Sequence, residues 1–349
     1  MVECGVTYFG VRRLQHAQVD LENIAKHGAT YVIHTLSEND WHLYFNTMQQ
    51  IIQATQKMGM KTWLDPWSVG YVFGADDDSL FAPSHTEACQ VDQFGRTTGC
   101  ACLNQPVFRD FVKGWIDAAV DLGVDMLFWD EPHFYWWDWF SGKYYKQPEG
   151  RWGCHCSLCQ SLYKEQFGEA IPIDAADPGV AKFKANTMTS FLGELFTYAK
   201  SKGAHNAVCI LPFEFDSGSL QKIEEIAKMT SLDNLGTDPY PFPWFGAPQI
   251  YSEKWKEYVG SYLEILLKIC QKFNKDNHFW LQGFSLPAND YGYMDSIMDF
   301  AVEKGITNLA VWGFDGHRDM SAFTCEQPDK VWEQIGQGFK RVRGISPSI

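Results

Sequence analysis

Short apolar runs alternate with amphipathic segments along the 349-residue chain. The apolar runs have the length of buried strands, whereas the amphipathic segments repeat their apolar residues with helical spacing. Glycine follows most helical segments, as in "KMG" before Met60 and "DLG" before Val124, where it accepts the left-handed conformation that ends a helix. The predicted strands are Gly5–Val11, Ala29–Leu36, Lys61–Pro66, Val124–Glu131, Asn206–Phe213, Asn234–Tyr240, His278–Phe284 and Thr307–Phe314. The predicted helical segments are Asp20–His27, Tyr44–Met58, Val107–Leu122, Ser157–Lys202, Leu220–Met229, Ser252–Phe273, Tyr293–Lys304 and Asp329–Val342.

This alternation predicts an α/β fold, a closed parallel (β/α)8 barrel of the TIM-barrel type. An open doubly wound sheet is the alternative, but it usually carries a Gly-rich phosphate loop after its first strand, and none follows the first strand here. Without a linker or a low-complexity segment, we expect residues 1–349 to form one catalytic barrel domain. Two insertions, Ser68–Gln105 and Phe134–Pro178, lengthen the third and fourth βα loops.

Acidic and aromatic side chains gather where the predicted strands end. The active sites of such barrels lie at this C-terminal edge. A single carboxylate there is often a helix cap or half of a salt bridge, but several strands with acidic ends indicate a site. The candidate catalytic and substrate-binding residues are Asp65, Trp67, Asp130, Glu131, His133, Glu214, Asp238, Tyr240, Trp244, Gln282, Trp312 and Asp315.

The segment "VDMLFWDEPHF" is the most informative of these strand ends. An apolar strand stops abruptly at two adjacent carboxylates, Asp130 and Glu131, and burying either charge unpaired would cost several kcal/mol. One interpretation is a helix cap with a salt bridge. The other is a general acid, Glu131, whose pKa is raised by apolar and like-charged neighbours.

The triplet Asp130-Glu131-Pro132 resembles the Asn-Glu-Pro of clan A glycoside hydrolases, in which this glutamate is the acid/base. The resemblance implies a glycosidase with Glu131 as proton donor. Clan A places a nucleophilic glutamate at the end of strand seven, where this chain has Gln282, which is neither a nucleophile nor a base. Another carboxylate must then serve, and we rank Asp238 first, followed by Glu214 and Asp65.

Adjacent Asp-Glu at this strand end also resembles the family 20 hexosaminidases. There the glutamate protonates the leaving oxygen, and the aspartate orients the acetamido group of the substrate, which attacks. This alternative would explain the missing protein nucleophile. The separation of the carboxylates decides between retention, at about 5–5.5 Å, and inversion, at about 6.5–9.5 Å.

The segment "GCHCSLCQ" brings Cys154, Cys156 and Cys159 together, too tightly spaced for disulfides among themselves. Such thiolates bind zinc when a fourth ligand joins, and Cys100 or Cys102 can supply it. The spacing resembles the zinc cluster of family 42 β-galactosidases, which implies Cys102 as the fourth ligand and a structural zinc. Free buried thiols are the alternative.

The composition of the chain limits the kinds of molecule that it is expected to bind. The net charge of −14, without a basic tail, disfavours nucleic acid and anionic membranes, and no apolar run is long enough to span a bilayer. The first residues lack a basic leader, so with the clustered cysteines we expect a reducing cytoplasm. Aromatic residues make up 15% of the chain and include 14 tryptophans. They suit either a large aromatic core or sugar platforms such as Trp67, Trp244 and Trp312.

The sequence therefore predicts a glycoside hydrolase for a short oligosaccharide or small glycoside, without an organic cofactor. A metal-dependent barrel isomerase or lyase and an inactive sugar-binding barrel are the alternatives. Sugar identity and oligomeric state, including a homo-oligomer, stay open.

Overall fold

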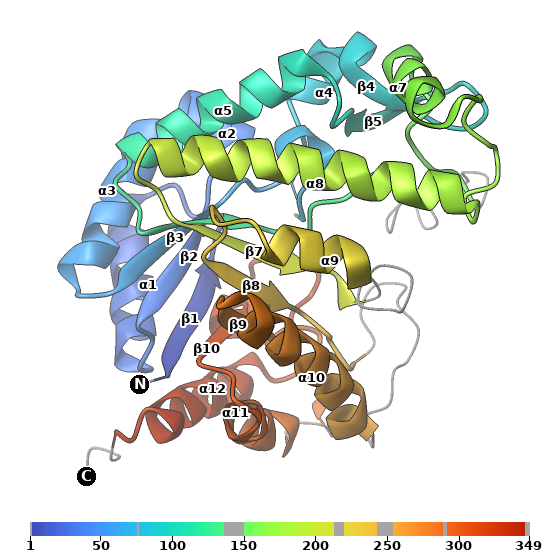
Figure 1. Cartoon of the computed structure of the whole chain (residues 1–349). Helices are drawn as coiled ribbons and strands as arrows, with labels where there is room; N and C mark the ends of the chain where they lie inside the picture. Colours follow the sequence, from blue (N-terminus) through green and yellow to red (C-terminus); the bar gives the residue numbers. More distant parts are fainter. Residues whose placement is uncertain are drawn as a thin grey trace.

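Eight parallel strands of the computed structural model close into a barrel in which β10 returns to pair with β1. The structure describes residues 2–74, 77–135, 150–212, 220–242, 254–288 and 292–345. Figure 1 shows the strands gathered inside a ring of helices. The barrel strands, in their order around the barrel, are β1 (Glu3–Tyr8), β2 (Tyr31–Thr35), β3 (Lys61–Asp65), β6 (Met126–Trp129), β7 (Asn206–Ile210), β8 (Asn234–Thr237), β9 (Asp276–Gln282) and β10 (Asn308–Trp312). The predicted (β/α)8 barrel is confirmed.

All eight predicted strands are present, but most are shorter at their C-terminal ends than the apolar runs suggested. The fourth, predicted as Val124–Glu131, is β6, which stops at Trp129. Its ladder ends because Glu131 has a φ of +40°, which no regular strand residue adopts. The apolar pattern thus predicts that a strand is present, whereas the backbone geometry at Glu131 determines where the strand ends.

Helices follow the strands and pack against the outside of the barrel. They are α1 (Leu14–Lys26), α2 (Glu38–Leu43), α3 (Phe45–Lys57), α4 (Phe81–Ser84), α5 (Pro106–Asp121), α7 (Ser157–Phe167), α8 (Pro178–Ser201), α9 (Leu220–Ala227), α10 (Trp255–Phe273), α11 (Gly292–Lys304) and α12 (Pro328–Val342). The long predicted region Ser157–Lys202 is two helices, because Gly168 takes a left-handed conformation after α7. In Figure 1, α8 runs alongside α5 over one side of the barrel. No helix among the described residues is both long and apolar enough to cross a membrane.

The strands alternate between two environments, as the two-residue repeat of a strand requires. The inward side chains form an aromatic cluster in the lumen, made of Tyr31, Ile33, Trp63, Phe128, Ala207, Cys209, Trp280 and Ala310. The outward ones pack under the helices; Trp129, for example, contacts Trp115. Both tryptophans are fully buried, so part of the aromatic excess belongs to the core.

The connection from β3 to α5 contains a hairpin that the sequence analysis missed. Strand β4 (Cys89–Val91) pairs antiparallel with β5 (Thr97–Ala101). Asp92 shapes the turn between them, because its side chain accepts hydrogen bonds from the backbone N–H groups of Phe94 and Arg96. An Asp followed three residues later by Gly95, which has a φ of +81°, is the turn signal that could have found it.

A single buried carboxylate, that of Glu38, holds the first part of this connection in place. Glu38 is 1% exposed and accepts hydrogen bonds from the backbone N–H groups of Gly70, Leu80 and Phe81 and from the Ser79 hydroxyl. These donors come from both ends of the segment between β3 and α4. Glu38 therefore fastens the segment that, as described below, forms one wall of the candidate site.

We predict that Glu38→Ala lowers the free energy of unfolding by about 2–4 kcal/mol, because it leaves several buried donors without an acceptor. Thermal unfolding should show a midpoint at least about 3 °C lower than that of the wild type. The exposed Glu22 on α1 provides the matched control, since Glu22→Ala should change stability by no more than about 0.5 kcal/mol. Equal midpoints for the two variants would contradict this role of Glu38.

Candidate active site

Strand alternation carries several predicted site residues to the C-terminal layer of the lumen. Asp65 follows the inward-facing Trp63 by two residues, and Asp130 follows Phe128 in the same way. The same spacing relates three more residues to inward positions on β8, β9 and β10: Asp238, Gln282 and Trp312. Polar side chains thus stand directly above an aromatic floor, where bulk water does not solvate them fully.

Glu131 reaches this layer because the backbone turns at the end of β6. A regular strand would direct Glu131 to the outside, but its φ of +40° departs from the strand, and its N–H donates to the Cys209 carbonyl at 3.2 Å. Gly74 lies against both carboxylates: a Cβ at this position would sit 2.5 Å from Asp130 Oδ2 and 3.2 Å from Glu131 Oε2. The two neighbouring acids therefore share one wall of the site.

A side-chain hydrogen bond joins Glu131 to Asp238. Burial raises the pKa of Glu131 well above its usual value of 4.5, and the charge of Asp238 raises it further. Burial also raises the pKa of Asp238 to about 7; the hydrogen bond with Glu131 opposes this shift, and the charge of Asp130 adds to it. Near neutral pH the pair therefore holds a proton between two oxygens.

Asp65 is the third acid whose titration these carboxylates alter. It is 2% exposed, and burial raises its pKa well above the usual 3.8, with further contributions from the charges of Asp130 and Glu131. Its Oδ1 has no hydrogen-bond partner among the described residues, nor does Oδ1 of Asp238. These two buried carboxyl oxygens therefore receive no hydrogen bond from the described residues.

Two further predicted residues adjoin the acids. His133 Nδ1 lies 2.7 Å from the Glu131 carbonyl oxygen; because that oxygen only accepts, Nδ1 carries the proton. Burial lowers the pKa of His133 to about 4, so the ring is neutral. Burial raises the pKa of Tyr240, as do the charges of Asp238 and Glu131.

Gln282 is fully buried, and the neighbouring backbone occupies its amide. Its Oε1 accepts from the Phe242 N–H at 3.0 Å, and its Nε2 donates to the carbonyls of Phe242 at 3.5 Å and Phe284 at 3.3 Å. A carboxylate could not donate the last two bonds. Gln282 thus joins the segments that follow β8 and β9, which accounts for glutamine at this strand end.

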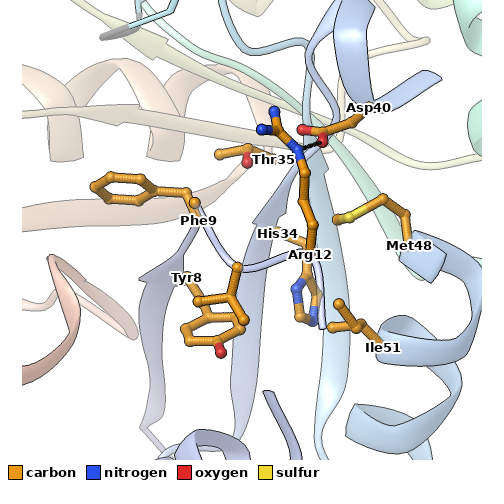
Figure 2. A pocket seen from close by; sticks show the side chains of 10 residues that line it. Tyr8, Phe9, Arg12, His34, Thr35, Asp40, Met48 and Ile51 are labelled. Atoms are coloured by element: carbon orange, nitrogen blue, oxygen red, sulfur yellow. Dashed lines mark hydrogen bonds and ion pairs between the residues drawn. The ribbon is translucent and has the colours of Figure 1, made fainter. Parts of the chain in front are cut away.

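Aromatic rings that follow or end β1, β3 and β10 form another part of the mouth. Trp67 stacks on Phe9 with centroids 5.1 Å apart and meets Trp312 edge-on at 6.2 Å. Next to Phe9, a small cleft opens where β1 and β2 end, between these strands and α3 (Figure 2). Arg12 stands at this cleft with its Nε 2.7 Å from Asp40 Oδ1, so the charge of this arginine is already compensated.

Of the remaining predicted residues, one described residue stands apart from this arrangement. Asp315 forms an ion pair with Arg318 at 3.1 Å, in a turn after β10. Glu214 and Trp244 lie outside the described residues.

The four predicted cysteines form one buried group. The Sγ atoms of Cys102, Cys154, Cys156 and Cys159 all lie within 4.8 Å of one another. Cys102 Sγ is 3.7 Å from Cys156 Sγ and 3.5 Å from Cys159 Sγ, close to the separation of about 3.8 Å that a tetrahedral site with metal–sulfur bonds of about 2.3 Å requires. All ten cysteines are free, and Cys100 is not part of the group. This group could hold a metal ion, and it ties the β4–β5 hairpin to α7.

Sequence reasoning missed Gly74 and Cys209 as parts of the site. Gly74 gives space to two carboxylates, but a glycine in a long loop carries no signal of its own. The Cys209 side chain hydrogen-bonds Asp238. Cys209 follows the inward-facing Ala207 by two residues, so strand alternation could have indicated that it faces the lumen too.

No family model matches the chain, and no curated protein sequence matches it. Solved structures do match its fold. The endo-1,4-β-mannanase of Rhizomucor miehei superposes with a TM-score of 0.64 at 11% identity, covering 99% of this chain and 95% of the mannanase. The endo-β-1,4-mannanase of Thermotoga petrophila gives 0.63 at 12%, covering 99% and 78%. The β-galactosidase of the psychrophilic Marinomonas gives 0.65 at 11%; the match covers 99% of this chain and 61% of that protein. The resemblance to glycoside hydrolase barrels is thereby confirmed for the fold.

Proposed function

We propose that the protein is a glycoside hydrolase with Glu131 as its general acid. The observation that carries this proposal is the hydrogen-bonded pair of Glu131 and Asp238 at the mouth of the barrel, which keeps a carboxylic acid protonated near neutral pH. The similarity of the fold to mannanases and a β-galactosidase supports it as an analogy.

In the proposed reaction, Glu131 gives its proton to the glycosidic oxygen as the bond from that oxygen to the anomeric carbon breaks. A positively charged, oxocarbenium-like sugar forms, a water adds its hydroxyl to the anomeric carbon, and a carboxylate of the site takes up the remaining proton of that water, which restores the acid for the next cycle. Carboxylates that remain ionised stabilise this charge. Asp130, directly beside Glu131, fits this role or that of a group that orients the substrate.

The reaction also needs a second carboxylate, and more than one acid of the site could supply it. The side-chain hydrogen bond between Glu131 and Asp238 shifts the pKa of both groups, which makes Asp238 the partner of this proton rather than the second carboxylate. Among the described carboxylates this favours Asp65, which has an oxygen without a partner, as the group across the mouth. We assign Asp238 to holding the proton on Glu131. Glu214 and an acetamido group of the substrate remain alternatives.

Aromatic residues suit the proposed substrate. Trp67, Trp312 and Tyr240 would provide faces for sugar rings, with His133 as a neutral polar neighbour. The crowded mouth favours a short oligosaccharide or small glycoside. We further propose that the cysteine group holds a structural zinc, because four thiolates leave no open position for catalysis. Ten free cysteines fit a reducing compartment.

The exchange Glu131→Gln tests the function. It removes the transferable proton while keeping the shape, so kcat should fall by about 10²–10⁴-fold on a chromogenic glycoside found by screening, with substrate binding retained. The exposed Glu257 on α10 gives the matched control Glu257→Gln, which should keep full activity. Unchanged turnover in Glu131→Gln would remove the assignment, and sugar binding without turnover in the wild type would favour an inactive sugar-binding barrel. Turnover abolished by a chelator and restored by a metal ion would favour the metal-dependent isomerase or lyase.

The pH profile tests the carboxyl pair. We expect kcat/KM to rise as Asp238 loses its proton near pH 7 and to fall at higher pH as Glu131 loses its own. Asp238→Asn should move the alkaline fall to lower pH, because the negative charge of Asp238 is one cause of the raised pKa of Glu131. Asp121→Asn, at an exposed position, should leave the profile unchanged. An alkaline limb that stays in place in Asp238→Asn would show that the two groups are not coupled.

Metal analysis tests the zinc. The purified protein should contain about one zinc ion per chain, and Cys159→Ser should lose most of it and unfold at a lower temperature. Cys100→Ser changes a buried cysteine outside the group and should keep the metal. Equal zinc contents in the two variants would contradict this assignment.

A further inference from the structure

Gln90 joins the β4–β5 hairpin to the segment that follows Glu131. It is fully buried in β4, and its Oε1 accepts a hydrogen bond from the backbone N–H of Tyr135 at 3.1 Å. Its Nε2 donates to the Ala101 carbonyl of β5 at 2.9 Å. One amide group is thus acceptor and donor at the same time, which fixes its orientation. An apolar side chain of similar length could make neither bond.

The backbone of Tyr135 is held on both sides. Its N–H donates to Gln90, and its carbonyl accepts from the Gly153 N–H at 2.9 Å. Gly153 also packs directly on the Gln90 amide, because a Cβ at this glycine would overlap Gln90 Oε1. Gln90 and Gly153 therefore form a clamp on the peptide groups of Tyr135.

Both arms of this clamp are anchored at the four-cysteine group. Ala101, whose carbonyl binds the Gln90 amide, directly precedes Cys102. Gly153 directly precedes Cys154. Since these cysteines belong to one buried group, the clamp rests on the part of the two long loops where they are tied together.

Two cationic side chains hold the rings of the same segment. The Arg151 guanidinium carbon lies 5.3 Å from the centroid of the Tyr135 ring. Lys184 Nζ lies 5.6 Å from the centroid of the Phe134 ring and 4.3 Å from that of a Trp152 ring. Contacts of this kind are attractive, because a ring face carries negative charge. The segment is thus fixed through its side chains as well as its backbone.

The connection from Tyr135 back to Glu131 is short and stiff. Only Pro132, His133 and Phe134 lie between them. The proline ring fixes its own φ and restricts the backbone of the residue before it, which is Glu131. His133 Nδ1 adds a hydrogen bond to the Glu131 carbonyl at 2.7 Å. A shift of Tyr135 is therefore passed on to Glu131 rather than absorbed on the way.

We propose that Gln90 is a positioning residue for Glu131: by clamping Tyr135, it keeps the acid in the buried corner from which it would protonate the substrate. This inference rests on the proposed role of Glu131 as general acid and adds the side chain that fixes its place. The hydrogen bonds of Gln90 go to backbone groups rather than to the acids, so its effect passes through the chain.

The exchange Gln90→Met keeps the length of the side chain and removes both hydrogen bonds. We expect kcat to fall by about 10–100-fold, because a small displacement of a catalytic group has this effect. KM should stay within about threefold, since the contacts that bind the substrate outside the corner are unchanged. The alkaline fall of kcat/KM should move to lower pH, because a loosened corner admits water and burial is the main cause of the raised pKa of Glu131.

Asn277 provides the matched control. It is also buried and bridges two backbone groups, since it accepts from the Thr307 N–H at 2.9 Å and donates to the Gly305 carbonyl at 3.4 Å. It lies near the start of β9, at the end of the barrel away from the acids. Asn277→Leu should lower stability but keep kcat and the pH profile. An equal change of the pH profile in both variants would contradict a specific role of Gln90.

The exchange Gln90→Glu separates positioning from the mere loss of glutamine. Burial favours the protonated carboxyl group, which can accept from Tyr135 and donate to Ala101 as the amide does. At pH 6 this variant should keep kcat within about threefold of the wild type. A loss of kcat as large as that of Gln90→Met would overturn the inference.

Carbon-13 NMR of the Glu131 carboxyl group gives a measurement that needs no turnover. In Gln90→Met this group should titrate closer to the usual 4.5 than in the wild type, whereas Asn277→Leu should match the wild type. If Gln90→Met does not fold, Gly153→Ala displaces the same amide and should give the same shift. An unchanged titration of Glu131 in the folded variant overturns the inference.

The two proposals fail in different ways. A shifted Glu131 titration in a protein that hydrolyses no glycoside would keep the positioning role of Gln90 and remove the hydrolase function. Turnover that depends on Glu131, together with a Glu131 titration and kcat unaffected by Gln90→Met, would keep the function and remove the role of Gln90.

Discussion

The repulsion among buried carboxyl groups at the mouth of the barrel is the constraint on which the rest of the site depends. Glu131 and Asp238 cannot both be ionised at low cost in the same hydrogen-bonded contact, so one proton stays between them. Asp65 is a third carboxyl group whose ionisation is disfavoured by burial and by the neighbouring negative charges. This electrostatic free energy favours the reaction when a leaving oxygen accepts the proton.

The scaffold holds this costly arrangement with interactions that lie outside the acids themselves. The positive φ of Glu131 is of the kind that costs about 1–3 kcal/mol and persists only where the surroundings enforce it. Gly74 leaves room for the two neighbouring carboxylates, and Glu38 fastens the segment that carries it. Gln282 links the segments that follow the neighbouring strands β8 and β9. Much of the polar chemistry around the site is therefore structural support.

The sequence alone predicted the barrel well, because eight apolar runs with helices between them have few other solutions. It also brought together the four cysteines, whose spacing is specific for a metal site. The sequence could not predict the backbone turn at Glu131 or the pairing of this residue with Asp238. Both depend on contacts between strands far apart in the chain. The role of Gln282 was equally hidden: a glutamine at a strand end does not reveal that backbone groups occupy its amide. The hairpin β4–β5 was missed although its turn carried a local signal.

Carbon-13 NMR of protein labelled at the glutamate side-chain carboxyl carbons tests the central claim most directly. One resonance, absent in Glu131→Gln, should titrate well above the usual glutamate value of 4.5 and shift to lower pH in Asp238→Asn. A Glu131 resonance that titrates at the ordinary value would mean that the carboxyl is ionised and solvated at neutral pH, and it would contradict the account of a proton held at the barrel mouth.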